Sequence, residues 1–209
     1  MYSKLKSKIN EILKESISTD RIKKLQVLIE YIQNKIDQNQ EVKLNFICTH
    51  NSRRSQFAQI WAHTAAYYYG VKVQCYSGGV EITAFNERAV KTIENVGFKV
   101  EKTGDDNPVY KISLSESNTP SLEMYSKLYD DQHNPTAGFS AIMTCSHADE
   151  NCPFISGTEK RIPITYEDPK AYDNSPMEVE MYEQRSFQIA SEMFYVFSKL
   201  ICLEAESFN

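Results

Sequence analysis

The sequence predicts an α/β fold built on a central, mostly parallel sheet of four strands, preceded by a helical extension. Two observations support this prediction. From about residue 42 onward, short apolar runs alternate with segments of helical period, whereas residues 1–40 follow the helical period alone. The chain of 209 residues is therefore divided into an N-terminal helical extension, 1–40, and a main domain, 41–209.

Composition and charge exclude several classes of function. The chain has 23 Lys and Arg against 28 Asp and Glu, a net charge of −5, and no long basic run, which argues against nucleic acid or an anionic membrane as partner. No window approaches the ~18 apolar residues of a membrane span. The N-terminus lacks the apolar core of a secretory signal. We therefore expect a cytoplasmic protein whose five cysteines are reduced.

The sequence of the extension predicts two amphipathic helices. Apolar residues recur at steps of three and four from Leu5 to Ile17 and again from Ile22 to Ile36, and Ser18 can cap the second run. Two interpretations fit this pattern. The helices pack on the main domain, or they form an interface with a partner, for example in a homodimer.

The main domain predicts strands and helices in alternation. Strands are expected at 42–47, 71–76, 139–144 and 161–166, and helices at 57–69, 86–96 and 177–203. Gly70 and Gly97 end the first two of these helices. Between them, 98–100 and 109–114 predict a hairpin at the sheet edge, and 120–129 a short helix.

The loop between the first strand and its helix contains the clearest chemistry. It reads Cys48-Thr49-His50-Asn51-Ser52-Arg53-Arg54-Ser55. A loop of this length can turn its N–H groups toward one point at the positive end of the helix, which binds a tetrahedral oxyanion and favours a cysteine thiolate. Arg54 can grip two oxyanion oxygens, the Ser55 hydroxyl can reach the Cys48 sulfur, and Asn51 tolerates a left-handed conformation.

This loop, together with Ser77-Gly78-Gly79 and the Asp168-Pro169 pair, resembles two related groups. These are the low-molecular-weight protein tyrosine phosphatases and the thioredoxin-coupled arsenate reductases that share their fold. The resemblance runs from about residue 44 to the last helix. It implies a three-layer fold, Cys48 as nucleophile and Asp168 as general acid/base. Arg54 with Thr49, His50, Asn51, Ser52, Arg53 and Ser55 would form the oxyanion-binding loop.

Two further cysteines distinguish the arsenate reductases from the phosphatases. Cys145 and Cys152, in a Cys-x6-Cys-Pro segment after the third strand, resemble the redox segment of the arsenate reductases. The resemblance implies that arsenate forms a covalent adduct with Cys48. Cys145 then attacks Cys48 and releases arsenite, Cys152 attacks Cys145, and thioredoxin reduces the resulting disulfide. No tightly bound cofactor is implied, because thioredoxin supplies the electrons.

Other interpretations remain open. The protein could hydrolyse phosphate monoesters with Cys48, Arg54 and Asp168 alone, or it could be a sensor that binds an oxyanion without turnover. Cys145 and Cys152 could be inert core thiols. As zinc ligands with His147 they would have an uncommon spacing and no evident fourth ligand, so we expect no metal site.

Several positions depart from the reductase pattern. Many relatives have Gly in place of His50 and Cys in place of Arg53. Some bind potassium through a glutamate where this chain has Gln59, so we do not expect a potassium site. The segment 104–138 is longer than the resemblance implies and could alter substrate access. Cys75 and Cys202 fit packing roles.

The spacing of the two redox cysteines adds a conformational expectation. If 145–152 were helical, seven steps at about 1.5 Å would separate the two Cα atoms by about 10.5 Å. A disulfide requires roughly 4.4–6.8 Å between Cα atoms. The segment would therefore have to unwind before it could be oxidised.

Overall fold

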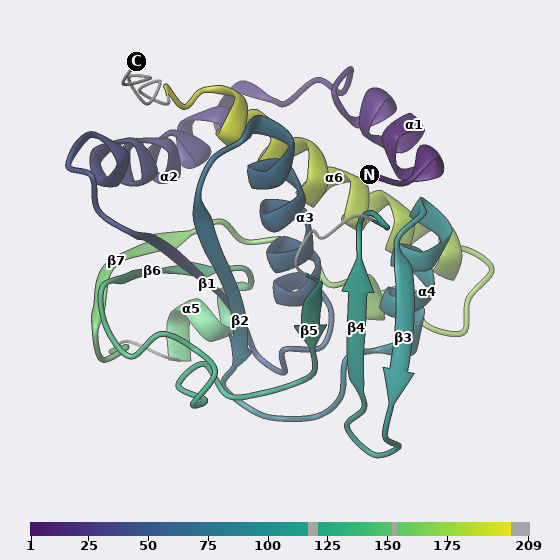
Figure 1. Cartoon of the computed structure of the whole chain (residues 1–209). Helices are drawn as coiled ribbons and strands as arrows, with labels where there is room; N and C mark the ends of the chain where they lie inside the picture. Colours follow the sequence, from purple (N-terminus) through teal and green to yellow (C-terminus); the bar gives the residue numbers. More distant parts are fainter. Residues whose placement is uncertain (117–120, 152–153, 202–209) are drawn as a thin grey trace.

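A parallel sheet of four strands forms the centre of the protein (Figure 1). The computed structural model describes residues 1–116, 121–151 and 154–201. The strands β1 (Val42–Cys48), β2 (Val73–Gly79), β6 (Phe139–Met143) and β7 (Thr158–Pro163) lie in the order β2-β1-β6-β7, and all three pairings are parallel. The predicted α/β class is confirmed. The last strand starts three residues earlier than its apolar run indicated.

Helices cover both faces of this sheet. Helices α3 (Arg54–Tyr69) and α6 (Glu178–Ser198) lie on one face, where Leu44 and Phe46 of β1 enter the larger core. On the other face Ile47 of β1 joins a smaller core with residues of β6 and of α5 (Ser146–Asn151). The alternation of side chains along β1 thus builds three layers. Helix α6 ends before the predicted boundary at 203, and Cys202 lies outside the described residues.

The N-terminal extension packs on the main domain. Helices α1 (Ser3–Ile12) and α2 (Thr19–Asp37) lie along α6 at the top of Figure 1. Their apolar residues belong to the larger core, among them Leu5, Ile9, Ile12, Leu25, Leu28 and Ile32. Ser18 caps α2 as expected, because its side chain accepts a hydrogen bond from the Arg21 N–H. The apolar stripes of both helices therefore face this chain's own core.

The segment after α4 (Glu87–Val96) forms a sheet of its own. Strands β3 (Lys99–Thr103), β4 (Val109–Ser113) and β5 (Leu122–Met124) pair antiparallel in that order. The predicted hairpin is confirmed, but it does not extend the main sheet. The predicted helix at 120–129 is wrong for the described residues, 121–129, because this backbone is extended and bonds to neighbouring segments. Gly79 N donates to Lys127 O and Tyr129 N donates to Gly79 O, at 2.8 and 2.9 Å.

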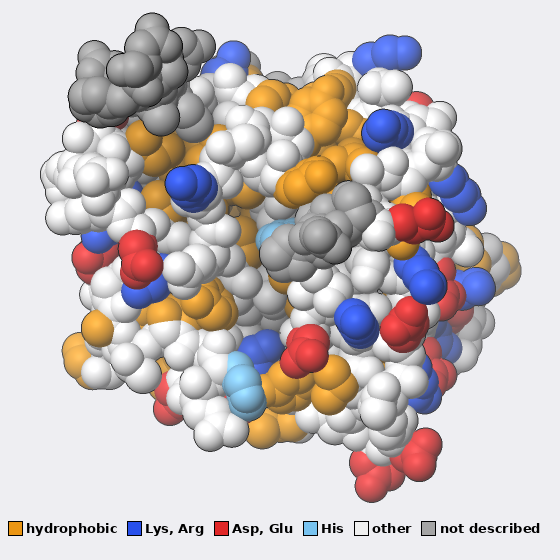
Figure 2. All heavy atoms as spheres, viewed as in Figure 1, with side chains coloured by type: hydrophobic (Ala, Val, Ile, Leu, Met, Phe, Trp, Pro, Cys, Tyr) orange, Lys and Arg blue, Asp and Glu red, His pale blue; other side chains and the backbone are white. Residues whose placement is uncertain are grey.

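The surface carries no dominant charge of one sign on the face shown. Figure 2 shows Lys and Arg side chains interspersed with Asp and Glu. Within the described ranges, no helix is long and apolar enough to cross a membrane. The mixture of charges agrees with the charge balance of the sequence.

Arg21 joins the extension to the segment that leads to Asp168. Its guanidinium donates to Thr165 O at 3.0 Å and pairs with Glu192 of α6, whose side chain is 2% exposed. Glu192 also accepts a hydrogen bond from Tyr166 Oη at 2.8 Å. The extension is thereby tied to the segment on which the Asp168 loop is built.

Removing this guanidinium is expected to destabilise the fold. Arg21→Met leaves the buried Glu192 carboxylate without its cation, which should lower the free energy of unfolding by about 3 to 5 kcal/mol. Urea unfolding measures the change. The double variant Arg21→Met/Glu192→Leu should regain most of it, because no buried charge is then unpaired. A loss below about 1 kcal/mol in the single variant would contradict this account.

Candidate active site

The loop between β1 and α3 is held by its carbonyl groups. Five consecutive carbonyls accept hydrogen bonds from outside the loop: Cys48 O from Val80 N, Thr49 O from Glu81 N, His50 O from Ser126 Oγ, Asn51 O from Gln56 Nε2 and Ser52 O from Asn86 N. Because these carbonyl groups point outward, the N–H groups of the loop face the inner side of the turn. No hydrogen bond from an N–H of residues 49–53 is found within the described chain. These donors lie at the N-terminus of α3 and form a cradle for an anion.

Close packing against β2 shapes this turn. A Cβ on Gly79 would lie 2.7 Å from Asn51 N and 2.9 Å from the carbonyl carbon of His50. A side chain there would push the loop out of position. The glycine at the end of Ser77-Gly78-Gly79 is therefore required by the close approach of two backbones.

A chain of side chains leads to the Cys48 sulfur. Asn51 has φ 47°, the left-handed conformation that was expected. Its Oδ1 accepts from Lys127 N at 3.1 Å, and its Nδ2 donates to Ser55 Oγ at 2.9 Å. Ser55 Oγ lies 3.1 Å from Cys48 Sγ. Because Ser55 Oγ already accepts a hydrogen bond from Asn51, its own proton is free to stabilise a thiolate on Cys48.

Arg54 and Asp168 meet at the mouth of the loop. Arg54 Nη2 lies 2.7 Å from Asp168 Oδ2, and Nη1 donates to Tyr166 O at 3.1 Å. Arg54 Nε is buried and has no hydrogen-bond partner among the described residues. Asp168 Oδ1 accepts from Lys170 N, so the carboxylate also caps the short helix η1 (Pro169–Tyr172). The guanidinium thus retains a donor for an oxyanion beside a carboxyl that can exchange protons.

Two side chains of the loop point to other partners. Arg53 Nε donates to Tyr182 Oη at 2.7 Å, and its Nη2 lies 3.5 Å from Asp173. His50 pairs with Glu81 at 3.3 Å. The guanidinium of Arg53 therefore binds α6 and the η1–α6 connection. Nothing local in the sequence identified Tyr182 or Asp173 as its partners.

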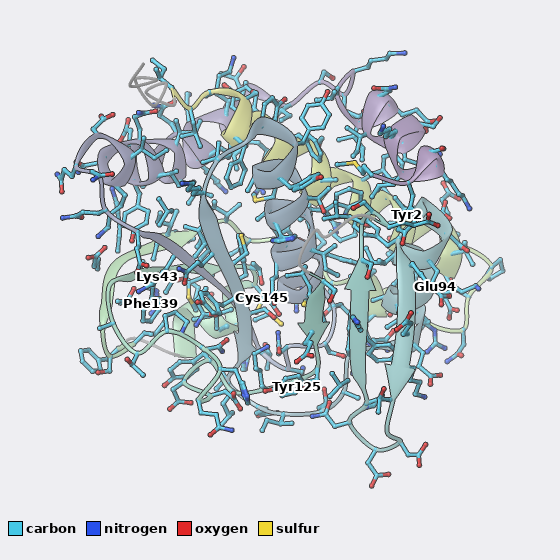
Figure 3. All side chains as sticks on the ribbon, viewed as in Figure 1. Tyr2, Lys43, Glu94, Tyr125, Phe139 and Cys145 are labelled. Carbon is cyan, nitrogen blue, oxygen red and sulfur yellow. The ribbon has the colours of Figure 1, made fainter. Side chains whose placement is uncertain are left out.

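The second thiol lies next to the loop. Cys145 Sγ is 3.4 Å from the hydroxyl of Thr49, the residue that follows Cys48. Both cysteines are buried in the smaller core, and Cys145 is labelled in Figure 3 near the lower end of β2. The residues that follow it form the helix α5, so the helical case considered for 145–152 applies to residues 146–151. Cys152 lies outside the described residues. The structure thus brings Cys145 into contact with the residue next to Cys48 and into the same buried cluster as Cys48, although the two cysteines are 97 positions apart in sequence.

A cavity of about 400 Å³ borders the loop. His50 and Ser52 line it from the loop, Phe85 from the β2–α4 connection and Asp106 from the β3–β4 hairpin. The inserted segment therefore helps to form the approach to the loop, and the volume suits a small organic group.

The remaining candidate ligands and thiols have structural contacts. Gln59 is buried and its Nε2 donates to Cys75 O, so it supplies an amide where a carboxylate would hold potassium. Among the described residues, no group of three His, Cys, Asp or Glu is arranged to hold a metal ion. Burial raises the pKa of the Cys75 thiol well above its usual range, which makes this cysteine unreactive.

Lys127 supports the loop from the inserted segment and was not singled out in the sequence. It is 4% exposed, its Nζ lies 4.7 Å from the centre of the Tyr125 ring, and burial lowers its pKa from 10.5 to about 8. The folded state therefore binds fewer protons than the unfolded state between these two values. Stability should rise with pH through this window, because the cost of burying the charge disappears.

Replacing this lysine tests the sign of that effect. Lys127→Met should abolish the rise in unfolding free energy and should be more stable than the parent protein near pH 7, by about 1 to 3 kcal/mol. Urea unfolding from about pH 7 to about pH 10 measures both quantities. Lys91→Met, at an exposed site of α4, is the control and should keep the slope. A lower stability of Lys127→Met near neutral pH would contradict the prediction.

Comparisons with known proteins agree with this geometry. No protein-family model matches the sequence. "Arsenate reductase 2" of Staphylococcus haemolyticus is 29% identical over 124 residues, covering 59% of this chain and 76% of the relative. "Arsenate reductase" of Bacillus cereus is 28% identical over the same length, covering 59% and 74%. Among solved structures, a low-molecular-weight protein tyrosine phosphatase from T. tengcongensis has a TM-score of 0.52 at 16% identity, covering 77% of this chain and 100% of its own. A mutant of YwlE from Bacillus subtilis has a TM-score of 0.50 at 13% identity, covering 76% of this chain and 97% of its own.

Proposed function

We propose that this chain is a member of the low-molecular-weight protein tyrosine phosphatase superfamily and, within it, a cytoplasmic, thioredoxin-dependent arsenate reductase. The observation that carries the proposal is the position of Cys145, whose sulfur contacts the residue next to Cys48. A phosphatase needs no second thiol there, because water can hydrolyse a phosphocysteine. Reduction of arsenate requires two electrons, which Cys48 and a second thiol supply together when their sulfurs form a disulfide.

The first step uses the anion cradle. The N–H groups of the loop and Arg54 hold the arsenate oxygens, and the Cys48 thiolate attacks arsenic. Asp168, 2.7 Å from Arg54, acts in its protonated form: as the S–As bond forms, it gives its proton to the arsenate oxygen whose As–O bond breaks and which leaves as water. The product is a covalent arseno-cysteine on Cys48. The Ser55 hydroxyl, 3.1 Å from the sulfur, stabilises the thiolate before the attack.

The second and third steps use the other two thiols. Cys145 attacks Cys48, the two sulfurs form a disulfide, and the electron pair of the broken S–As bond remains on arsenic, which leaves as arsenite. Cys152 then attacks Cys145 and frees Cys48. Thioredoxin reduces the Cys145–Cys152 disulfide, so the enzyme needs no tightly bound cofactor.

The proposal is tested by a coupled assay. Purified protein with arsenate, thioredoxin, thioredoxin reductase and NADPH should consume NADPH in a one-to-one ratio with arsenite formed. Omitting thioredoxin should stop turnover after one arsenite per chain. NADPH consumption without arsenite, or no turnover under any of these conditions, would refute the proposal.

Oxidation of Cys145 should unwind α5. Residues 146–151 form α5, and a helix continued over the seven steps from residue 145 to residue 152 would hold the two Cα atoms about 10.5 Å apart, too far for a disulfide. We expect the amides of α5 to lose hydrogen-exchange protection by at least about tenfold in the Cys145–Cys152 oxidised form. Equal protection in reduced and oxidised protein, with the disulfide verified by mass spectrometry, would contradict this prediction.

Phosphate-monoester hydrolysis is the second candidate function. Cys48, Arg54 and Asp168 suffice for it, and the cavity beside the loop has room for the organic group of an ester. This activity would not require Cys145. The two candidates are therefore separated by what happens when Cys145 is replaced.

A further inference from the structure

The Thr49 hydroxyl lies between a buried thiol and an exposed imidazole. Thr49 Oγ1 is 3.4 Å from Cys145 Sγ and 3.3 Å from His147 Nδ1. Cys145 is 1% exposed, whereas His147, on the first turn of α5, is exposed. A hydroxyl has one proton to donate and two lone pairs that accept. Thr49 can therefore accept from the thiol and donate to the ring at the same time.

We propose that His147 takes up, through Thr49, the proton that Cys145 must lose before it attacks Cys48. The inference deepens the proposed function and rests on it. His147 lies 3.3 Å from the Thr49 hydroxyl and would act on Cys145 through it, so it is a positioning residue for the second thiol. The proton transfer requires the tautomer of His147 in which Nδ1 carries no proton, because the Thr49 hydroxyl donates to that atom.

The step balances as follows. The Cys145 thiol gives its proton to Thr49 Oγ1, and the proton of Thr49 passes to His147 Nδ1. The Cys145 thiolate attacks Cys48 Sγ, so an S–S bond forms and the S–As bond breaks. Both electrons of that bond go to arsenic, which is reduced from As(V) to As(III), while two thiol sulfurs are oxidised to a disulfide. The imidazolium of His147 then releases its proton to water.

The surroundings of Cys145 leave the Thr49 hydroxyl as its route to a base. The other polar contact of its sulfur among the described residues is the Ala148 N–H, at 3.4 Å, which can donate a hydrogen bond but cannot accept a proton. On α5, Asp149 is paired with Arg161 of β7 at 2.8 Å, and Glu150 is exposed. Cys48 ends β1, the strand on which α5 packs. Imidazole is the side chain suited to exchange a proton near neutral pH.

A single-turnover experiment tests the relay. Fully reduced protein is mixed with excess arsenate, without thioredoxin, and arsenite release is timed from about pH 5.5 to about pH 9. In the parent protein the rate should rise with pH and then level off, because the relay requires a neutral imidazole as proton acceptor. His147→Gln should be slower by at least about tenfold near pH 7, and the deficit should shrink at high pH, where hydroxide deprotonates Cys145 directly. Glu150→Gln, which removes a charge at an exposed position of the same helix with little change in shape, is the matched control and should keep the parent profile.

Variants of Thr49 locate the path of the proton. Thr49→Val should reproduce the pH-dependent deficit of His147→Gln, and the double variant should show little further loss, because both remove the same relay. Thr49→Ser, which keeps the hydroxyl, should recover most of the loss of rate that Thr49→Val shows near pH 7. Additive losses in the double variant, or a His147→Gln profile equal to that of the parent, would overturn the inference.

A second readout does not depend on arsenate. The rate of Cys145 alkylation by iodoacetamide in reduced protein, followed by mass spectrometry of its peptide, should fall at least about fivefold near pH 7 in His147→Gln. If the parent releases no arsenite yet this fall is observed, the reductase proposal fails and the relay stands. If the parent releases arsenite and His147→Gln leaves the alkylation rate unchanged, the His147 relay is refuted and the reductase proposal stands.

Discussion

Cys145→Ser is expected to lower arsenite formation by more than about 10³-fold, because it removes the nucleophile that releases arsenite from Cys48. Hydrolysis of an aryl phosphate should remain within about threefold of the parent rate, since that reaction needs only Cys48, Arg54 and Asp168. The measurement is a pair of assays on the same preparation. One follows arsenite with the thioredoxin system, and the other follows aryl alcohol release without reductant.

A matched control separates chemistry from the loss of a buried sulfur. Cys75→Ser makes the same replacement at a buried cysteine in β2, remote from the loop in sequence and unreactive because of burial. It should retain arsenate turnover. If Cys145→Ser reduces the arsenate assay no more than Cys75→Ser does, Cys145 is a packing residue and phosphate-ester hydrolysis becomes the better account.

Arg54→Lys is expected to lower kcat/KM about 10²- to 10³-fold for both arsenate and an aryl phosphate. The guanidinium has a fixed fork of donors, and one of them, Nε, is buried without a partner in the described chain. Lysine supplies a single point charge and would also lose one of the two contacts with Tyr166 and Asp168.

Arg53→Lys is the neighbouring control for this prediction. Its guanidinium binds Tyr182 and Asp173, so its replacement should mainly affect stability and should change kcat/KM by less than about tenfold. Equal losses of kcat/KM in the two variants, with circular dichroism showing both proteins folded, would contradict the assignment of oxyanion binding to Arg54 rather than Arg53.

Local chemistry explains why much of the loop was predictable. A strand, a turn and a helix contiguous in sequence determine where Cys48, Asn51 and Ser55 lie, and the left-handed Asn51 followed from residue type. The four-stranded sheet followed in the same way, because buried parallel strands are apolar runs that periodicity detects.

The features that the sequence did not predict depend on contacts between residues that are distant in sequence. Residues 121–129 looked helical, but their backbone is extended because it bonds to Gly79 and Asn51, contacts that no local pattern records. The same applies to Arg53, whose side chain binds Tyr182 in the last helix, and to Arg21, which ties the extension to Thr165. The juxtaposition of Thr49 with His147 likewise needs the pairing of β1 with β6.

The most direct test of the central claim, that two distant thiols act in turn on one bound oxyanion, is disulfide mapping in a trapped enzyme. Cys152→Ser stops the relay after its second step. Reduced Cys152→Ser treated with arsenate in the absence of thioredoxin should yield one arsenite per chain and a Cys48–Cys145 disulfide, identified by mass spectrometry of the linked peptides. Arsenite without that disulfide, or a protein whose Cys48 and Cys145 both stay reduced, would contradict the account.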